Sequence, residues 1–261
     1  MDIQPTDLSP LDQPCDVIFP VLHGEWGEDG TLQLELETRG LKFVGSGSAA
    51  SRLGMNKVET KKVWEKAGLP TPPYRVVTSI NEPIPQEACV VKAIDSGSSV
   101  DVYVCRGAAE GHAHAADAVA KVLAKHPAAL IEKFISGPEL TVGLFEEKSL
   151  APIRIVPKVE FFDYEAKYKR SDTEHRFDTG LPAALIAECK TLAEKANSIV
   201  GARDLARVDI MIDETTSRPY LLEINTLPGF TSKSLLPEAA GHAGIPFAQL
   251  VDRLVKRAAA R

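Results

Sequence analysis

The sequence predicts an α/β protein whose later part consists of α+β units. Two observations lead to this fold class. A continuous apolar run of strand length, residues 16–22, leads into a turn and then a helix, and short strands and helices alternate along the rest of the chain. The chain has 261 residues, of which 44% are hydrophobic and 25% charged, so it holds enough apolar sequence for several packed cores.

Periodicity and stop signals define the expected elements. Segment 16–22 is expected to be a strand buried on both faces, because it is apolar throughout. One helix is expected over 51–67, ended by Gly68 and by the prolines that follow it. The other expected helices are 31–38, 113–125, 181–200 and 247–260, and the other expected strands are 41–44, 74–77, 89–93, 100–105, 130–134, 139–145, 207–212 and 220–224.

Composition and charge argue against several classes of protein. The net charge of -6 does not favour a general affinity for nucleic acid or for an anionic membrane. No apolar run reaches the roughly 20 residues of a membrane helix, and the N-terminus lacks the basic start and apolar core of a secretion signal. The four cysteines form no CxxC pair, which fits a reducing compartment. We therefore expect a cytoplasmic protein without nucleic-acid or membrane partners.

The strongest chemical signal lies near the C-terminus. Arg207 and Asp209 are two residues apart on one expected strand, and Glu223 and Asn225 are two apart on the next. Residues at this spacing point to the same face of a strand, so a hairpin would bring the four side chains together. Two carboxylates and an amide oxygen suit Mg²⁺. The same spacing also occurs at solvent-facing acidic edges, and that alternative stays open.

Two loops carry weaker signals for anion binding. Lys92 ends a buried strand and is followed by a Gly/Ser-rich loop, 96–99, whose backbone N–H groups could surround phosphate oxygens. This loop is not a Walker A motif and is also compatible with a plain hairpin turn. Segment 161–170 mixes aromatic and charged residues and could close over a ligand, with Lys167 against phosphate. An ordinary surface loop is the alternative there.

Together these segments resemble the D-alanine–D-alanine ligase family of ATP-grasp enzymes. The matching segments occur in family order from Asp16 onward: HGEWGEDG, GLPTPPY, VKAIDSGSSV, IEKFISGPELTV, FFDYEAKY, LARVDIMID and LLEINTLPGFTSKSLLP. The resemblance implies an ATP-grasp fold, with a truncated N-terminal α/β domain at 1–48 and two α+β lobes at 49–135 and 136–261. It also implies ATP-dependent joining of two D-alanines through an acyl phosphate, for cell wall synthesis.

The resemblance further implies a role for each matched position. The residues that would contact ATP are Lys57, Lys92 and Lys167 at the phosphates, Glu132 and the backbone of Ile135 at adenine, and Glu139 at the ribose. Two Mg²⁺ or Mn²⁺ ions would be held by Asp209, Glu223 and Asn225. The residues that would surround the amino acids are His23 near the first D-alanine, Ser234 and Leu235 at the carboxylate of the second, and a hydrogen-bonded group of Glu28, Ser98 and Tyr168. Arg207 and the backbone N–H of Gly229 would face the developing oxyanion.

Family resemblance also bears on the product and on the ends of the chain. Tyrosine at the position of Tyr168 accompanies a dipeptide product in the family, whereas phenylalanine accompanies an ester-forming ligase that uses D-lactate. A homodimer is implied as well. Family members begin with a strand and a glycine-rich loop that carries a glutamate for the first D-alanine, so roughly 40 further residues are expected upstream of Met1.

Small departures from the family pattern leave two alternatives open. Asn56 stands where aspartate is common, Ala93 replaces a proline, and Asp101 places a negative charge beside the phosphate loop, which should weaken binding unless it faces away. The chain could instead be a catalytically impaired ATP-binding fragment or paralogue. It could also be another ATP-grasp carboxylate–amine ligase with a different acceptor.

Overall fold

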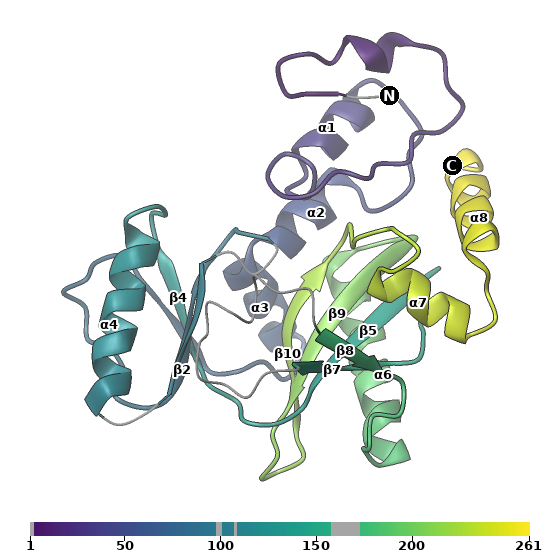
Figure 1. The fold of residues 1–261 in the computed structure, drawn as a ribbon. Helices are drawn as coiled ribbons and strands as arrows, with labels where there is room; N and C mark the ends of the chain where they lie inside the picture. Colours follow the sequence, from purple (N-terminus) through teal and green to yellow (C-terminus); the bar gives the residue numbers. More distant parts are fainter. Residues whose placement is uncertain (1–2, 98–100, 107–108, 158–172) are drawn as a thin grey trace.

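Two antiparallel sheets form the frame of this computed structural model, which describes residues 3–97, 101–106, 109–157 and 173–261 (Figure 1). The smaller sheet has the strand order β1–β4–β2–β3, with bounds Tyr74–Val77 for β1, Cys89–Ala93 for β2, Val102–Cys105 for β3 and Ala129–Lys133 for β4. Helix α4 (Ala109–Leu123) covers one face of this sheet. Its Ala115, Val119 and Val122 side chains form a buried core with Val91 and Ile131.

The larger sheet has the order β10–β9–β5–β7–β8, with β6 paired to β5. The bounds are Glu139–Phe145 for β5, Lys148–Ser149 for β6, Ile153–Pro157 for β7, Thr173–Arg176 for β8, Leu205–Ile212 for β9 and Pro219–Asn225 for β10. Helix α6 (Ala183–Val200) packs on one face, where Leu140, Val142 and Leu144 of β5 are buried. Gly143 points to the other face and lies against Leu236 of α7 (Leu235–His242). Each face of β5 therefore meets its own helix.

Between the sheets the chain forms two helices where one was expected. The single helix predicted over 51–67 is wrong, since α2 (Ser48–Met55) and α3 (Lys57–Lys66) are separated at Asn56. Asn56 has an extended backbone, with φ -84° and ψ 99°, and its side-chain oxygen accepts a hydrogen bond from the N–H of Glu59 at 3.0 Å. A new N-cap thus ends one helix and begins the next. As a result the N–H of Lys57 donates to the carbonyl of Ile94, just after β2, at 3.0 Å.

The N-terminal segment contains less sheet than expected. Residues 16–22 do not form the predicted strand, and within the described residues Ile18 makes a single parallel bridge to Phe43. Pro20 offers no N–H to continue the ladder, and Val21 is 62% exposed, so the segment is not buried on both faces. The strand expected at 41–44 is reduced to the same bridge. The segment is instead held by helix α1 (Thr31–Thr38), whose Leu32 and Leu36 are buried in a local core.

The other predicted elements are confirmed to within a few residues where the structure describes them, including α8 (Phe247–Ala259). The elements that were not predicted are the short helix η1 (Ser9–Asp12), β6, β7, β8 and α7. Of the helices in the described ranges, none combines the length and apolarity that crossing a membrane requires.

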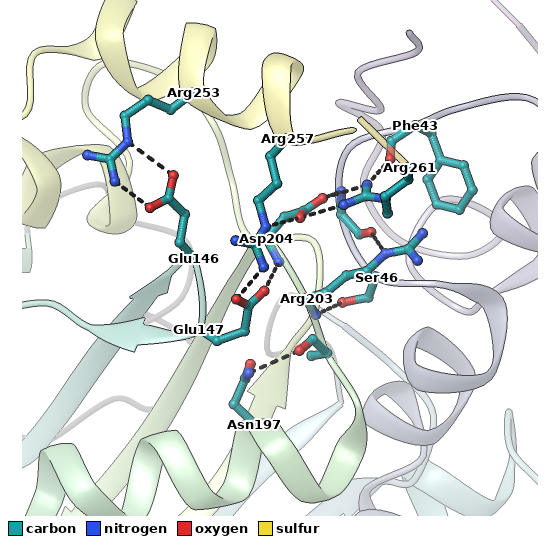
Figure 2. Close-up of polar contacts among 12 residues, drawn as sticks. Phe43, Ser46, Glu146, Glu147, Asn197, Arg203, Asp204, Arg253, Arg257 and Arg261 are labelled. Carbon is teal, nitrogen blue, oxygen red and sulfur yellow. Dashed lines mark hydrogen bonds and ion pairs between the residues drawn. The ribbon is translucent and has the colours of Figure 1, made fainter. Parts of the chain in front are cut away.

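Asp204, at the start of β9, ties the N-terminal segment to α8 (Figure 2). Its side chain is fully buried, and its carboxylate accepts hydrogen bonds from the N–H of Gly45 at 2.8 Å and from Arg257 at 3.1 Å. Two further bonds of 2.8 Å come from Arg261. The backbone N–H of Asp204 donates to Glu147 at 2.9 Å. The residue has a left-handed φ of 66°, which aspartate tolerates better than most side chains.

Replacing Asp204 by asparagine should lower the free energy of unfolding by about 1.5–3 kcal/mol, because an amide cannot neutralise the two guanidinium groups that face it. Asparagine also tolerates the left-handed backbone, so the change isolates the charge. Urea unfolding at neutral pH measures the effect. The matched control is Asp252→Asn, an exposed partner of Lys256, which should change stability by less than about 0.5 kcal/mol. Equal stability of Asp204→Asn and the native protein would contradict the role given to this carboxylate.

Candidate active site

Two adjoining cavities lie where the sheets and the N-terminal segment meet. The larger, of about 660 Å³, is lined by residues of both sheets and falls in the usual size range of small-molecule sites. The smaller, of about 330 Å³, reaches toward the N-terminal segment. Four residues line both cavities, which places them at the junction: Lys57, Ser96, Arg207 and Glu223.

The β9–β10 hairpin brings together the four polar residues that the sequence predicted there. Glu223 lies directly opposite Asp209, and Asn225 lies opposite Arg207. Directly opposed residues share a face of the sheet. Asp209 also lies opposite Thr141 of β5, whose hydroxyl donates to its carboxylate at 2.6 Å. Three neighbouring strands therefore present one continuous polar surface to the cavities.

A bulge in β10 determines which of its residues reach this surface. The register shifts between Leu221, which pairs with Ile210, and Glu223, which pairs with Asp209, so Leu222 is an extra residue. Leu221 and Ile224 are three residues apart, yet both are buried in the core against α6. Strict alternation would put them on opposite faces. The bulge resolves this conflict and turns Glu223 toward the cavities.

Arg207 and Asp209 form a bidentate ion pair at the junction. Nε of Arg207 lies 3.0 Å from one carboxylate oxygen of Asp209, and Nη2 lies 3.0 Å from the other. Burial alone would lower the pKa of the Arg207 guanidinium, but the attraction of Asp209 outweighs it and raises the pKa above its ordinary value. Nη1 has no hydrogen-bond partner among the described residues, and it remains available to an anionic group in either cavity.

Lys57 connects the two sheets across the junction. Its side chain is 8% exposed and its Nζ donates to the carbonyl of Ser96, in the loop after β2, at 2.7 Å. The same Nζ lies 3.7 Å from the carboxylate of Glu223 on β10. The break at Asn56 makes this position possible, because Lys57 stands at the first turn of α3.

A buried charge cluster lies at the wall of the larger cavity. Glu132 on β4 is only 2% exposed, and its two carboxylate oxygens each lie 2.5 Å from a lysine Nζ, one from Lys61 and one from Lys92. Burial would raise the pKa of Glu132, but the two lysines outweigh it and lower the pKa to about 2. Glu132 is therefore ionised throughout the physiological range, and the cluster carries one net positive charge.

The smaller cavity gathers predicted residues from distant parts of the chain. Nδ1 of His23 lies 3.9 Å from a carboxylate oxygen of Glu28, whose other oxygen accepts the N–H of Gly24. Gly229 faces the cavity, and a Cβ added there would lie 3.2 Å from Oγ of Ser234 and 3.8 Å from the ring of His23. A side chain at position 229 would therefore crowd Ser234 and His23, and glycine keeps this part of the smaller cavity open for a small ligand.

Most of the predicted site residues therefore meet in one place. The larger cavity is lined by Lys57, Lys92, Glu132, Ile135, Glu139, Arg207, Asp209, Glu223 and Leu235, and the smaller one also by His23, Glu28, Asn225 and Gly229. Ser234 lies beside Gly229. The remaining three predictions, Ser98, Lys167 and Tyr168, lie outside the described residues.

Four basic residues that line the larger cavity were not predicted as site residues: Arg106, Lys133, Arg154 and His175. Arg154 on β7 and His175 on β8 both line it, and Arg154 donates to the carbonyl of Thr179 at 3.0 Å. Apolar and polar residues alternate around Arg154, and this alternation could have predicted β7. In strands this short, however, alternation alone does not distinguish a strand from a loop.

The carboxylate of Asp101 is paired with basic residues and is not an isolated negative charge. Its carboxylate lies 2.8 Å from Nζ of Lys125 and 3.2 Å from the ring of His126, and it accepts the hydroxyl of Tyr103. Although partial burial would raise its pKa, these partners lower the pKa below its ordinary value. The negative charge of Asp101 is thus paired with the positive charge of Lys125, which follows α4 in the chain.

The pKa of Glu132 generates a stability prediction. An unfolded glutamate titrates near 4.5 and the folded one near 2, so the ion pairs stabilise the fold fully above pH 4.5 and lose this effect as the pH falls toward 2. Glu132→Gln should therefore cost about 3 kcal/mol at pH 7 and clearly less at pH 3. Denaturant unfolding at both pH values tests this, with exposed Glu188→Gln as the control. A loss that is equally large at both pH values would contradict the assignment.

Known proteins with similar sequences and folds identify the family. Residues 2–46 match the family model described as D-ala D-ala ligase N-terminus, and residues 63–256 match D-ala D-ala ligase C-terminus. The D-alanine–D-alanine ligase of Laribacter hongkongensis is 40% identical over 248 residues, which cover 93% of this chain and 79% of that protein.

Solved structures agree with the sequence comparison. The crystal structure of D-alanine–D-alanine ligase from Bacillus anthracis matches with a TM-score of 0.83 and 32% identity, over 98% of this chain and 83% of that one. A second structure of that ligase, complexed with ATP, matches with a TM-score of 0.82 and 32% identity, over 97% of this chain and 82% of that one. The expected ATP-grasp architecture of mixed helices and sheets is confirmed. This chain belongs to the D-alanine–D-alanine ligase family.

Proposed function

We propose that this protein is an ATP-dependent ligase that joins two D-alanines into D-alanyl-D-alanine for peptidoglycan synthesis. One observation carries the proposal. The bulged β9–β10 hairpin places Arg207, Asp209, Glu223 and Asn225 at the junction of a nucleotide-sized cavity and a smaller one, with Lys57 across from Glu223. A ligase that activates one small substrate with ATP and joins it to another needs this arrangement of two connected compartments.

ATP would occupy the larger cavity. Lys57 and Lys92 would meet its phosphates, Glu132 and the backbone of Ile135 would face adenine, and Glu139 would bind the ribose. The excess positive charge of the Glu132 cluster favours a polyanionic ligand in a chain whose net charge is -6. Lys167 would add a further contact to the transferred phosphate. The Bacillus anthracis ligase, which this chain resembles over most of its length, was solved in complex with ATP, and this supports ATP as the ligand.

The donor set on the hairpin fits two Mg²⁺ or Mn²⁺ ions. Within the described residues no group of three or more His, Cys, Asp or Glu side chains forms a self-sufficient metal site. Asp209, Glu223 and Asn225 instead supply two carboxylates and one amide oxygen, and the amide also accepts the N–H of Leu227 at 2.9 Å. Mg²⁺ commonly takes one or two carboxylates and completes its shell with substrate phosphates and water. Bound there, the ions would offset charge on the transferring phosphoryl group.

The chemistry proceeds in two steps. A carboxylate oxygen of the first D-alanine attacks the γ-phosphorus of ATP, which forms an acyl phosphate and releases ADP. The neutral amine of the second D-alanine then attacks the acyl carbon to form a tetrahedral intermediate. Its collapse breaks the bond between the acyl carbon and the phosphate oxygen, so that phosphate leaves, and the nitrogen loses a proton as the amide forms. The Nη1 of Arg207, which has no hydrogen-bond partner among the described residues, and the backbone N–H of Gly229 would stabilise the oxyanion of the tetrahedral intermediate.

The smaller cavity suits the two amino acids. His23 would lie near the first D-alanine, while Glu28 would form a hydrogen-bonded group with Ser98 and Tyr168 near the second. The carboxylate of the second D-alanine would sit where α7 begins, at Ser234, which lies beside Gly229, and at Leu235, which lines the adjoining larger cavity. Ser234 is the N-cap residue of that helix, yet its side chain does not cap it, so the first N–H groups of α7 are left for an anion.

Further parts of the proposal concern organisation and location. We infer a domain division at 1–48, 49–135 and 136–261, supported by the separation of the two sheets. A homodimer in the cytoplasm is inferred from membership of the D-alanine–D-alanine ligase family.

D-alanine-dependent release of ADP and formation of the dipeptide, measured with Mg²⁺, tests the function directly. Arg207→Ala should lower turnover by about 10²–10³-fold while Kd for ADP changes little, because the guanidinium is needed chiefly in the transition state. Arg218→Ala is the matched control, since Arg218 is exposed in the hairpin turn and stacks on Tyr220. Nucleotide binding by the native chain without any turnover would favour a catalytically silent ATP-binding protein instead, and unchanged turnover of Arg207→Ala would refute its assigned role.

Tyr168 provides a test of product choice. Tyr168→Phe should shift the product at neutral pH toward D-alanyl-D-lactate when both acceptors are supplied, because the hydrogen-bonded group that favours the amine is broken. Mass spectrometry of the product mixture gives the ratio of ester to dipeptide. Tyr220→Phe, at a half-buried tyrosine of β10 that lines neither cavity, should leave the ratio as it is. An unaltered ratio in Tyr168→Phe would argue against the specificity role.

A further inference from the structure

Lys61 is a fully buried lysine outside the set of ligand-binding residues considered above. It lies on α3 with 0% of its side chain exposed, and its Nζ is 2.5 Å from Glu132 and 2.6 Å from the hydroxyl of Thr71. Its Nζ also lies 5.8 Å from the centroid of the Tyr74 ring. Lysine is rarely buried to this extent unless it is paired. It does not line either cavity, so direct contact with a ligand does not account for it.

One branch of its contacts, that of Lys61 with Glu132, affects the charge at the wall of the larger cavity. Oε1 of Glu132 makes no hydrogen bond of good angular geometry among the described residues and depends on the Lys61 charge, whereas Oε2 faces Lys92. Without Lys61, Glu132 and Lys92 would neutralise each other. With Lys61 present the cluster keeps one positive charge, and Lys92, which lines the cavity, retains its attraction for phosphate.

The other branch leads to the bulge in β10. Thr71 accepts the hydrogen bond of Lys61 and donates its own hydroxyl to the carbonyl of Leu221 at 3.0 Å. The N–H of Leu221 is held by the carbonyl of Pro70 at 2.9 Å. Leu221 is the last residue before the register shift that turns Glu223 toward the cavities. Lys61 thus contacts, directly or through one hydroxyl, both the smaller sheet and the strand that carries Glu223.

We propose that Lys61 is a positioning residue that sets the charge of Lys92 and Glu132 on one sheet and, through Thr71, the placement of the Glu223 bulge on the other. The proposal rests on the proposed function in one respect, since turnover is read as dipeptide synthesis. Burial lowers the pKa of Lys61 below its ordinary value, and the adjacent carboxylate of Glu132 partly opposes this shift. The residue itself touches neither nucleotide nor amino acid.

The test separates the two branches. Lys61→Met keeps the length and apolar stem of the side chain, and it should raise Kd for ADP in the absence of D-alanine by about 10–100-fold, as expected for losing a charged interaction. It should also lower kcat. Thr71→Val interrupts only the branch to Leu221, so kcat should fall about 2–10-fold while Kd for ADP stays within about twofold. Lys62→Met is the matched control, an exposed neighbour on the same helix that pairs with Glu59, and it should resemble the native protein.

Several outcomes would overturn the proposal. The proposal is wrong if Lys61→Met has the Kd for ADP and the kcat of the native protein. It is also wrong if the variant only loses active fraction while Kd and KM stay unchanged, because a purely structural role predicts that result. If Lys61→Met does not fold, Thr71→Val decides, and a native kcat in that variant refutes the branch to the bulge. If the native chain binds ADP but makes no dipeptide, the proposed function fails, whereas a raised Kd in Lys61→Met still supports the charge branch.

Discussion

The register between β9 and β10 is the constraint on which the site depends. On β9 the residues Val208, Ile210 and Ile212 fill the core against α6, so Arg207 and Asp209 must point the other way. On β10 both Leu221 and Ile224 are needed in the same core, and only an extra residue between them allows this. A slip of one residue would exchange the two faces of the strand. The apolar core and the polar site are thus specified by one and the same pairing.

Buried charge is used in two different ways in this molecule. Asp204 is surrounded by donors from Gly45, Arg257 and Arg261, so its charge is fully compensated and the group fixes distant segments to each other. Glu132 is paired with two lysines, so positive charge remains beside a cavity. Buried ion pairs seldom add much net stability compared with apolar residues of equal volume. Their value here lies in fixing geometry and, near the cavity, in preparing an anion site.

The sequence predicted the site best where polar residues of matching chemistry recur at strand spacing. Residues two apart on adjacent strands predicted the meeting of Arg207, Asp209, Glu223 and Asn225, and the hairpin brings them together. It did not foresee the bulge, because Leu222 resembles any apolar strand residue. The sequence of 16–22 indicates an apolar segment, but it does not indicate whether a neighbouring strand can pair with it. The predicted strand was wrong because the segment makes only a single bridge, from Ile18 to Phe43, among the described residues.

Other features depend on packing, which local sequence does not contain. Lys61 lies in a charged stretch of α3 that suggests a solvent-facing lysine, and only the surrounding sheets bury it. The break at Asn56 was likewise hidden, because helical periodicity continues on both sides of it. Asparagine is a strong N-cap residue, but an asparagine within a continuous helical pattern does not by itself predict that one helix ends and another begins.

The contacts between the N-terminal segment and α8 have a consequence for protein synthesis. The carbonyl of Phe43 accepts a hydrogen bond from Arg261, its partner 218 positions later in the chain. At a translation rate of about 5–20 residues per second, the segment around Phe43 leaves the ribosome on the order of ten to forty seconds before that partner exists. During this interval Val44, which shares a buried cluster with Leu250 and Leu254 of α8, has no α8 to pack against. This stretch of the nascent chain therefore reaches its final packing only after α8 has been synthesised.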